Sequence, residues 1–366
     1  MNVEFLSHAD AAIQNRNLIL RFVRKHKVVS RTDIWSSMRI SRASVTQIIR
    51  QMLESGLITE SEVENQRKRT SGKGRSPSRT LCLNENSRFM YVFDWNERIL
   101  CLVNLGGVIL ESLVLSFPQK CDPLIFAEIV LGGVAELRKR RPIDAQAFLG
   151  FGMSMPGLID CRTQTVLNSV ELNWRNVDMK SLFASEFGED IFLEQTANML
   201  ALGEYEFGAA SNYSHILLVL MEDEGIGTSV IVHGDCQHGS NYMHGELGHI
   251  KLPSDIPCSC GQKGCLEAVV RYHLINNGYV IDEEIIGYLS TAIATAVNLY
   301  DPGIVLLTGS LVWSLAEDQQ RNMIELIRNQ VTDGRIRKLD FHICSEGNTM
   351  GIKGMTAHIF NHHFAI

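Results

Sequence analysis

A compact group of cysteine and histidine residues constrains the fold more than any other feature of this 366-residue chain. Cys258, Cys260 and Cys265 fall within eight positions, among glycines that permit a tight fold-back, and His249 lies nine residues upstream. Three sulfurs and one imidazole form a ligand set typical of tetrahedral zinc. Because protein side chains would fill all four positions, we predict a closed, structural zinc site. The alternative is a group of buried, inert cysteines.

Composition and hydropathy limit the class of protein. With 45% hydrophobic and 20% charged residues, the chain resembles an ordinary folded protein. Nine cysteines, an odd number scattered along the sequence, indicate a reducing compartment. The longest apolar runs, such as residues 216–221 and 304–307, are far shorter than the roughly 18 residues that suggest a membrane span. No secretory signal is recognisable, so we predict a cytoplasmic protein without membrane association.

Charge is distributed unevenly along the chain. Residues 1–80 contain 15 Lys and Arg against 7 Asp and Glu, a net charge of +8, whereas the remainder carries −15. A basic first fifth joined to an acidic remainder predicts that the N-terminal segment binds a polyanion. A solvated basic face is the alternative.

Three short helical patterns follow one another within the basic segment. The first has an apolar stripe over residues 18–23, and the second begins at Ser30, which can form a capping box with Asp33. The third begins at Ser41, keeps its apolar residues on one face and ends at residues 55–56. This arrangement is typical of a helix-turn-helix unit that binds DNA.

The outward face of the third predicted helix carries side chains suited to double-stranded DNA. The residues outside its apolar stripe are Arg42, Ala43, Ser44, Thr46, Gln47 and Arg50. Arg42 and Gln47 can pair with base edges in the major groove, and the methyl group of Ala43 can contact thymine. The two hydroxyl side chains and Arg50 suit phosphates. The alternative is the plain solvent face of an amphipathic helix.

Two short predicted strands, residues 57–60 and 80–83, flank a stretch rich in Arg, Lys, Ser and Gly. A helix-turn-helix followed by such a hairpin is a winged helix with a long wing. Arg75 lies on a glycine-rich arm, residues 72–77, suited to the narrow minor groove of A/T-rich DNA. A flexible linker is the competing interpretation.

The remaining chain predicts a mixed α/β fold. Strand patterns occur at residues 91–94, 99–103, 108–110, 148–155, 191–193, 216–221, 229–232 and 304–307, and helical patterns at 126–138, 179–186 and 285–300. Two successive rounds of this alternation predict two related lobes with a ligand-binding cleft between them. The expected domains are a winged helix-turn-helix at 1–80, a first lobe at 81–200 and a second lobe with the zinc loop at 201–366.

The sequence from residue 246 to 267 resembles the ROK family (repressor, open reading frame, kinase). The resemblance rests on Glu-x-Gly-His followed by Cys-x-Cys-Gly-x-x-Gly-Cys-x-Glu and extends over nearly the whole chain. It implies a two-lobed, actin/hexokinase-like domain in the repressor branch that controls sugar uptake and catabolism. It also implies zinc ligation by His249, Cys258, Cys260 and Cys265. Sugar hydroxyls would bind Glu246, His249 and Glu267, because carboxylates and a zinc-held imidazole offer directed partners.

Three departures from the kinases of that family argue against an enzyme. Residues 94–98, Asp-Trp-Asn-Glu-Arg, lack the glycines that let backbone amides approach ATP phosphates. Thr196 stands where those kinases carry the aspartate that deprotonates the sugar hydroxyl, and a threonine is no general base near neutral pH. Residues 222–227 are acidic where a phosphate would lie. An active sugar kinase remains the alternative.

The resemblance also predicts partners. Gly157, Gln195 and Thr196 would complete the wall of the sugar pocket beside the two glutamates. The expected partners are a DNA operator and a sugar or sugar-phosphate effector. We expect a homodimer or tetramer, because two winged helices can read a pseudo-palindrome. Control by a transport-protein partner is a further alternative, and repression is favoured over activation.

Overall fold

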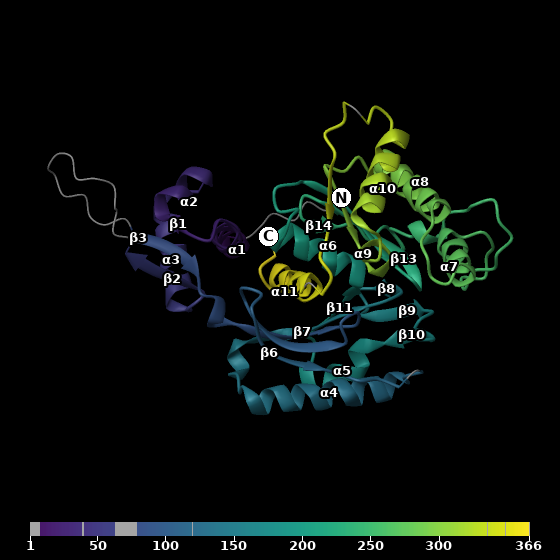
Figure 1. Ribbon diagram of the computed structural model, residues 1–366. Coiled ribbons are helices and arrows are strands. Elements are labelled where there is room, and N and C mark those ends of the chain that lie inside the picture. The colour runs from purple at the N-terminus through teal and green to yellow at the C-terminus, as the bar shows by residue number, and fades with distance from the viewer. Residues whose placement is uncertain are drawn as a thin grey trace.

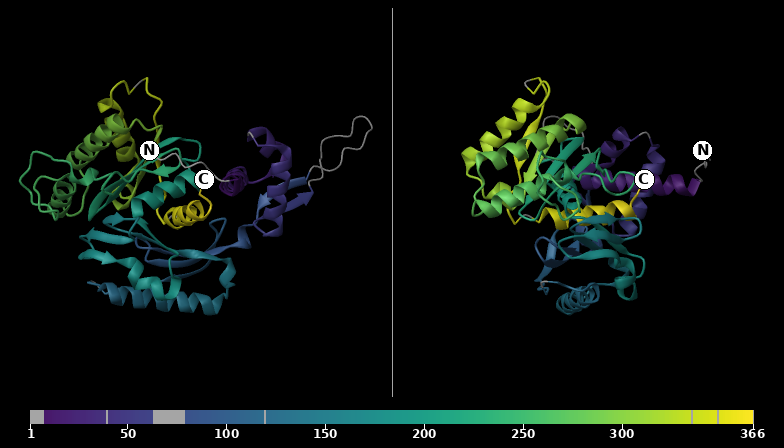
Figure 2. Two further views of the ribbon diagram at one scale, coloured as in Figure 1. Left: turned by 180° about the vertical axis from the view of Figure 1, so that it is seen from behind. Right: turned by 90° about the vertical axis from the view of Figure 1, so that its right-hand side faces the viewer.

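The computed structural model describes residues 8–38, 40–62, 79–118, 120–334, 336–347 and 349–365. An N-terminal head, shown in purple and blue in Figure 1, lies to one side of a larger two-lobed body. The view from behind in Figure 2 shows the same separation. Within these residues, no helix is both long enough and apolar enough to cross a membrane.

The head has the winged-helix arrangement that the sequence predicts. Its helices are α1 (His8–His26), α2 (Arg31–Ser37) and α3 (Arg42–Glu54), and its sheet has the order β1 (Val29–Ser30), β3 (Arg79–Leu83), β2 (Ile58–Glu62). Ser30 and Asp33 form the expected capping box, and the Ser41 hydroxyl caps α3 by accepting from the Ser44 amide. Arg75 and the rest of the predicted arm lie outside the described residues.

Two five-stranded sheets repeat one topology. In each, three consecutive strands form an antiparallel meander. A fourth strand pairs in parallel with the first strand of that meander, and a fifth pairs in parallel with the fourth. The first sheet has the order β11 (Ile191–Gln195), β7 (Phe148–Met155), β4 (Phe89–Asp94), β5 (Ile99–Asn104), β6 (Ile109–Val114). The second has the order β14 (Asp235–Cys236), β13 (Gly225–Val232), β12 (His215–Glu222), β15 (Ile304–Thr308), β16 (Asp340–Ile343). The expectation of two related lobes is confirmed.

Helices cover both sheets. The outer layers are α4 (Pro123–Arg140) and α5 (Met179–Phe187) on the first sheet, and α7 (Leu266–Asn276), α8 (Glu283–Tyr300), α9 (Ser310–Trp313) and α10 (Glu317–Gln330) on the second. Short 3-10 turns occur at Glu85–Ser87 (η1), Ala145–Ala147 (η2) and Leu247–His249 (η3). A small antiparallel sheet, β10 (Trp174–Asp178), β9 (Thr165–Ser169), β8 (Leu158–Asp160), was not predicted. Its strands are short and lack a run of apolar residues.

Two helices, α6 (Thr196–Phe207) and α11 (Met350–His363), lie between the sheets (Figure 1). β4 shows how both faces of a strand are buried: Met90 and Val92 belong to the core on the α6–α11 side, and Tyr91 and Phe93 to the core under α4. The α6–α11 core continues without a break into the apolar core of the head. The C-terminal helix α11 packs on β4 and β7 of the first sheet. The domain boundaries at residues 80 and 200 stay predictions.

Glycines allow α6 and α11 to cross in close contact. A Cβ atom added at Gly354 would overlap the carbonyl oxygen of Met199, and one at Gly203 would overlap that of Met350. A Cβ at Gly351 would lie 2.5 Å from the Asp94 carboxylate. Because these neighbours are mainly backbone atoms, they cannot move aside as a flexible side chain would.

We predict that Gly354→Ala lowers the free energy of unfolding by about 1–3 kcal/mol, since the added methyl group separates two packed helices. Chemical denaturation with urea measures the change. Gly132→Ala is the matched control, because Gly132 lies in α4 and a Cβ added there would meet no heavy atom within 4 Å. There the substitution should stabilise the helix by about 0.5–1 kcal/mol. Equal effects of the two changes would show that the crossing is loosely packed.

Candidate functional site

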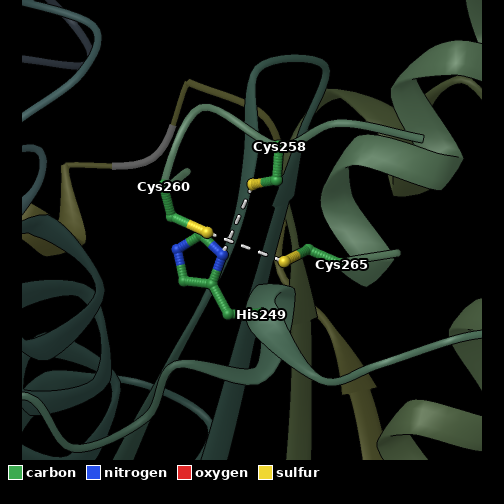
Figure 3. A group of neighbouring side chains, drawn as sticks. All are labelled: His249, Cys258, Cys260 and Cys265. Carbon is green, nitrogen blue, oxygen red and sulfur yellow. Dashed lines mark hydrogen bonds between the residues drawn. The ribbon is translucent and has the colours of Figure 1, made fainter. Parts of the chain in front are cut away.

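The predicted zinc ligands converge in the structure. His249 ends η3, Cys258 and Cys260 lie in the loop that follows, and Cys265 directly precedes α7 (Figure 3). The Sγ atoms of Cys260 and Cys265 are 3.7 Å apart, and His249 Nδ1 lies 3.7 Å from Cys258 Sγ. Zinc–sulfur bonds of about 2.3 Å imply a tetrahedral edge of about 3.8 Å. The four side chains therefore fit a tetrahedral zinc ion.

The loop that carries these cysteines is held by its own backbone. The Cys258 amide donates to the Gln262 carbonyl at 2.8 Å, and the Leu252 amide donates to the Gly264 carbonyl at 2.7 Å. Gly264 has a φ of +70°, and a Cβ there would lie 2.6 Å from the carbonyl oxygen of Leu252. Only glycine suits such a position. The fold-back predicted from the glycines is thus present.

Two further side chains support the cluster. Lys251 Nζ donates to Cys265 Sγ at 2.9 Å, so its positive charge offsets the charge of the thiolates. Glu267 Oε1 lies 3.3 Å from Cys258 Sγ and 3.5 Å from His249 Nδ1. Partners of this kind orient metal ligands and tune their basicity. Sequence analysis missed Lys251, because its contact with Cys265 forms only when the loop folds back.

The two nitrogens of His249 face different partners. Nδ1 points to the cysteine cluster, whereas Nε2 lies 3.6 Å from Glu246 Oε2. Burial raises the pKa of Glu246 above its ordinary value, opposed by His249 and reinforced by Glu267. The structure therefore brings the three predicted sugar-binding residues of the second lobe, Glu246, His249 and Glu267, into one connected group.

The other three predicted sugar residues lie in the first lobe. Gln195 Nε2 donates to the Gly157 carbonyl at 3.0 Å, which ties the end of β11 to the turn before β8. Thr196 begins α6 and is 4% exposed, and its hydroxyl has no hydrogen-bond partner among the described residues. A buried hydroxyl without a partner is costly unless a ligand or water completes it.

The start of β13 connects the two groups. A Cβ added at Gly227 would lie 3.9 Å from Ala197 at the start of α6, and one at Gly225 would lie 3.7 Å from Glu267. The two sets of predicted sugar residues thus flank the first residues of β13. This arrangement can present hydroxyl, amide and carboxylate groups to one polar ligand.

Thr196 lines a small acidic cavity. Its lining includes Asp94, Glu97, Glu222 and Thr196, and no Lys or Arg is among the residues that line it. Burial raises the pKa of Asp94, and its Oδ2 accepts from the Ser154 hydroxyl at 2.7 Å. Burial, followed by repulsion from Asp94, also raises the pKa of Glu97. Glu222 Oε2 accepts from the Ser310 amide at 3.1 Å, so a carboxylate occupies a donor that a phosphate could use.

The predicted DNA-binding side chains lie on one face of α3. Five of them line one shallow surface depression: Arg42, Ala43, Thr46, Gln47 and Arg50. The guanidinium of Arg42 lies over the ring of Trp35, 4.0 Å from its centroid, which restrains its direction. Ser44 differs, because its hydroxyl is 2.8 Å from the Ser41 hydroxyl and it is only half-exposed.

This chain is similar to known proteins over most of its length. A model of the ROK family matches residues 100–279. A putative xylose repressor of Caldicellulosiruptor sp. (strain Rt8B.4) is 26% identical over 344 residues, covering 82% of this chain and 84% of the relative. The crystal structure of a ROK family transcriptional regulator, a homolog of the E. coli MLC protein, matches with a TM-score of 0.75 at 21% identity over 96% of both chains. A ROK hexokinase from Thermus thermophilus matches with a TM-score of 0.59 at 22% identity, over 73% of this chain and 96% of the hexokinase.

We predict that Cys265→Ser lowers the zinc content of the purified protein by one ion per chain, because it removes a buried ligand of the cluster. Inductively coupled plasma mass spectrometry measures the content. Cys82→Ser is the control, since Cys82 lies in β3 of the head. Lys251→Met should keep the zinc but weaken its affinity about 10- to 100-fold. Unchanged zinc content in Cys265→Ser would contradict the assignment.

Proposed function

Because this chain carries a ROK family domain, we propose that it is a DNA-binding transcriptional repressor that responds to a sugar. The resemblance read from residues 246–267 is confirmed by the family match. Relatives aligned over more than four fifths of the chain are named xylose repressor and DNA-binding transcriptional dual regulator NagC. The hexokinase, in contrast, aligns with only 73% of this chain.

The observation that carries the proposal is the exposed face of α3 on the winged-helix head. Arg42, Gln47 and Arg50 project from a helix whose opposite side, including Ile48 and Ile49, is buried. A helix presented in this way enters the major groove, where arginine and glutamine side chains read base edges and phosphates. The basic charge of residues 1–80 supports the same conclusion.

The acidic cavity argues against phosphoryl transfer. Kinases stabilise the phosphates with backbone amides and cations, whereas Asp94, Glu97 and Glu222 line this cavity. Thr196 also replaces the expected general base. The same charges disfavour a phosphorylated effector, so an uncharged sugar or an amino sugar fits the cleft better than a sugar phosphate.

α6 gives the sugar residues a direct route to the head. It begins at Thr196 in the cleft and ends at Phe207, beside α1. Arg24 of α1 is buried against the end of α6: its guanidinium lies 5.1 Å from the ring centroid of Phe207, 4.2 Å from that of Phe360 and 3.9 Å from Glu206 Oε2. If a bound ligand moved the start of α6, the end of α6 would therefore move against α1 of the head.

The buried guanidinium of Arg24 is only weakly compensated by its neighbours. Burial lowers the pKa of Arg24, and its Nε has no hydrogen-bond partner among the described residues. A buried, weakly paired charge costs free energy. Two further hydrogen bonds, from Asn17 Nδ2 to the Ala365 carbonyl at 2.6 Å and from Arg21 to the Phe364 carbonyl at 3.2 Å, hold α1 against the residues that follow α11. A ligand that binds the two lobe arrangements with different affinities can change the position of α1 relative to α6 and α11.

Assembly and partners follow from the same proposal. A dimer or tetramer would place two heads on one pseudo-palindromic operator. A cytoplasmic location is consistent with operator binding. Control by a transport-protein partner remains an alternative, which DNA release by a protein fraction without any response to sugars would favour.

DNA binding is tested with the full chain and a randomised duplex library. We predict selection of a defined sequence, with an affinity that falls steeply as salt increases. Gln47→Ala should relax the preference at one base and cost about 1–3 kcal/mol, whereas Arg50→Ala should weaken all sequences alike and reduce the salt slope by about 1. Arg141→Ala, an exposed arginine beyond the end of α4, is the control. A flat salt response, or no selected sequence, would refute DNA reading by α3.

Sugar binding is tested by thermal shift against monosaccharides, amino sugars and their phosphates. We predict that a sugar that raises the melting temperature also changes operator affinity. Thr196→Val should weaken that sugar about 10-fold, because it removes a buried hydroxyl at constant volume.

Thr291→Val is the matched control for this experiment. Its hydroxyl lies on the exposed face of α8 and donates to the Gly287 carbonyl, so sugar affinity should not change. Phosphate transfer to a hexose at enzymatic speed by the wild-type chain would instead establish the kinase alternative. Thr196→Asp, which restores the missing base, shows whether the phosphate site still works.

A further inference from the structure

A second group of potential metal ligands lies outside the cysteine cluster. Cys161 is in the turn between β8 and β9, Glu194 is in β11, and His238 follows β14. One ligand atom from each of the three side chains lies within 4.8 Å of the other two. The three residues come from distant segments, so the fold, and not a local motif, brings them together.

The carboxylate of Glu194 is the best-defined member of the group. It is 1% exposed, and Oε2 accepts from Asn198 Nδ2 at 2.9 Å and lies 3.0 Å from His238 Nε2. Oε1 is buried and has no partner among the described residues. A buried carboxylate oxygen without a donor is unusual, because its desolvation is not offset. A cation at this position would complete it.

The donor set identifies the class of cation. A thiolate, an imidazole and a carboxylate together suit a borderline metal such as Zn²⁺, whereas Mg²⁺ and Ca²⁺ prefer oxygen ligands. Zinc bonds of about 2.0–2.3 Å require ligand atoms about 3.3–3.8 Å apart. Glu194 Oε2 and His238 Nε2 are 3.0 Å apart, and all three ligand atoms lie within 4.8 Å of one another. Asn198 would serve as the outer partner that orients the carboxylate.

The group of Cys161, Glu194 and His238 lies where the two lobes meet. Cys161 and Glu194 belong to the first lobe, and His238 belongs to the second, at the edge of its sheet. The same two segments also meet where the guanidinium of Arg162 lies 4.5 Å from the ring centroid of Tyr242. A metal ion here would join the two lobes beside Gln195 and Thr196.

We propose that Cys161, Glu194 and His238 form a second zinc site, which fastens the loop after β14 to the first lobe. Three protein ligands leave one coordination position for water or a small ligand. The site differs from the Cys3His cluster, which lies within one segment of the second lobe. The proposal of this site does not rest on the proposed DNA-binding or sugar-binding function.

The test uses the full-length chain with Zn²⁺ as the probe. The protein is purified with zinc in excess and desalted, and its zinc content is measured together with anomalous diffraction at the zinc edge. We expect one zinc ion beyond that of the Cys3His cluster, with an anomalous peak between Cys161, Glu194 and His238. Cys161→Ser and His238→Gln should each lose that ion and that peak while keeping the zinc at His249.

Controls separate this site from the cluster. Cys265→Ser should lose the other ion and keep the one at His238, and Cys82→Ser should keep both. Added zinc should raise the melting temperature of the wild type more than that of Cys161→Ser. His238→Gln provides a second variant if Cys161→Ser folds poorly. Wild-type protein with no peak at His238, or equal zinc in the wild type and both variants, would overturn the proposal, and the three side chains would then only hydrogen-bond one another.

Discussion

The close crossing of α6 and α11 is the contact on which the other parts of this structure depend. Backbone atoms meet at Gly203 and Gly354, and the pair supplies one face of each lobe's core and the surface on which α1 packs. Packed interiors transmit displacement, so a rearrangement of the lobes would displace α6 and α11 at this crossing. With 12 residues, α6 spans about 18 Å from Thr196 in the cleft to Phe207 beside Arg24. It can therefore connect the cleft and the head without an intermediate element.

The cysteine-bearing loop of the second lobe relies on local constraints, whereas the core under α4 in the first lobe relies on aromatic packing. Phe93, Phe126 and Phe151 fill the core under α4, whereas the loop of residues 250–265 contributes little apolar surface. Its shape comes from glycines, backbone hydrogen bonds and the convergence of its three cysteines on His249. Metal binding supplies folding free energy where a short loop cannot bury enough surface.

Much of this molecule is determined locally, and sequence analysis could predict those parts. The caps at Ser30 and Ser41, the apolar stripe of α3 and the spacing of Cys258, Cys260 and Cys265 each depend on neighbours within a few residues. The long apolar strands, and the repetition that indicates two lobes, were predictable for the same reason. The motif resemblance added the roles of Glu246 and Glu267, which remain predictions.

Tertiary structure alone decided the rest. Lys251 beside Cys265, Arg24 between two phenylalanines, and the meeting of Cys161, Glu194 and His238 all join residues that no local pattern relates. The return of α11 to the first sheet is of the same kind. Sequence specifies such contacts only through the packing of the whole chain, because their stability arises from burial and charge that exist after the elements have docked. Periodicity and spacing report local geometry, so they do not predict contacts between residues that are far apart in the sequence.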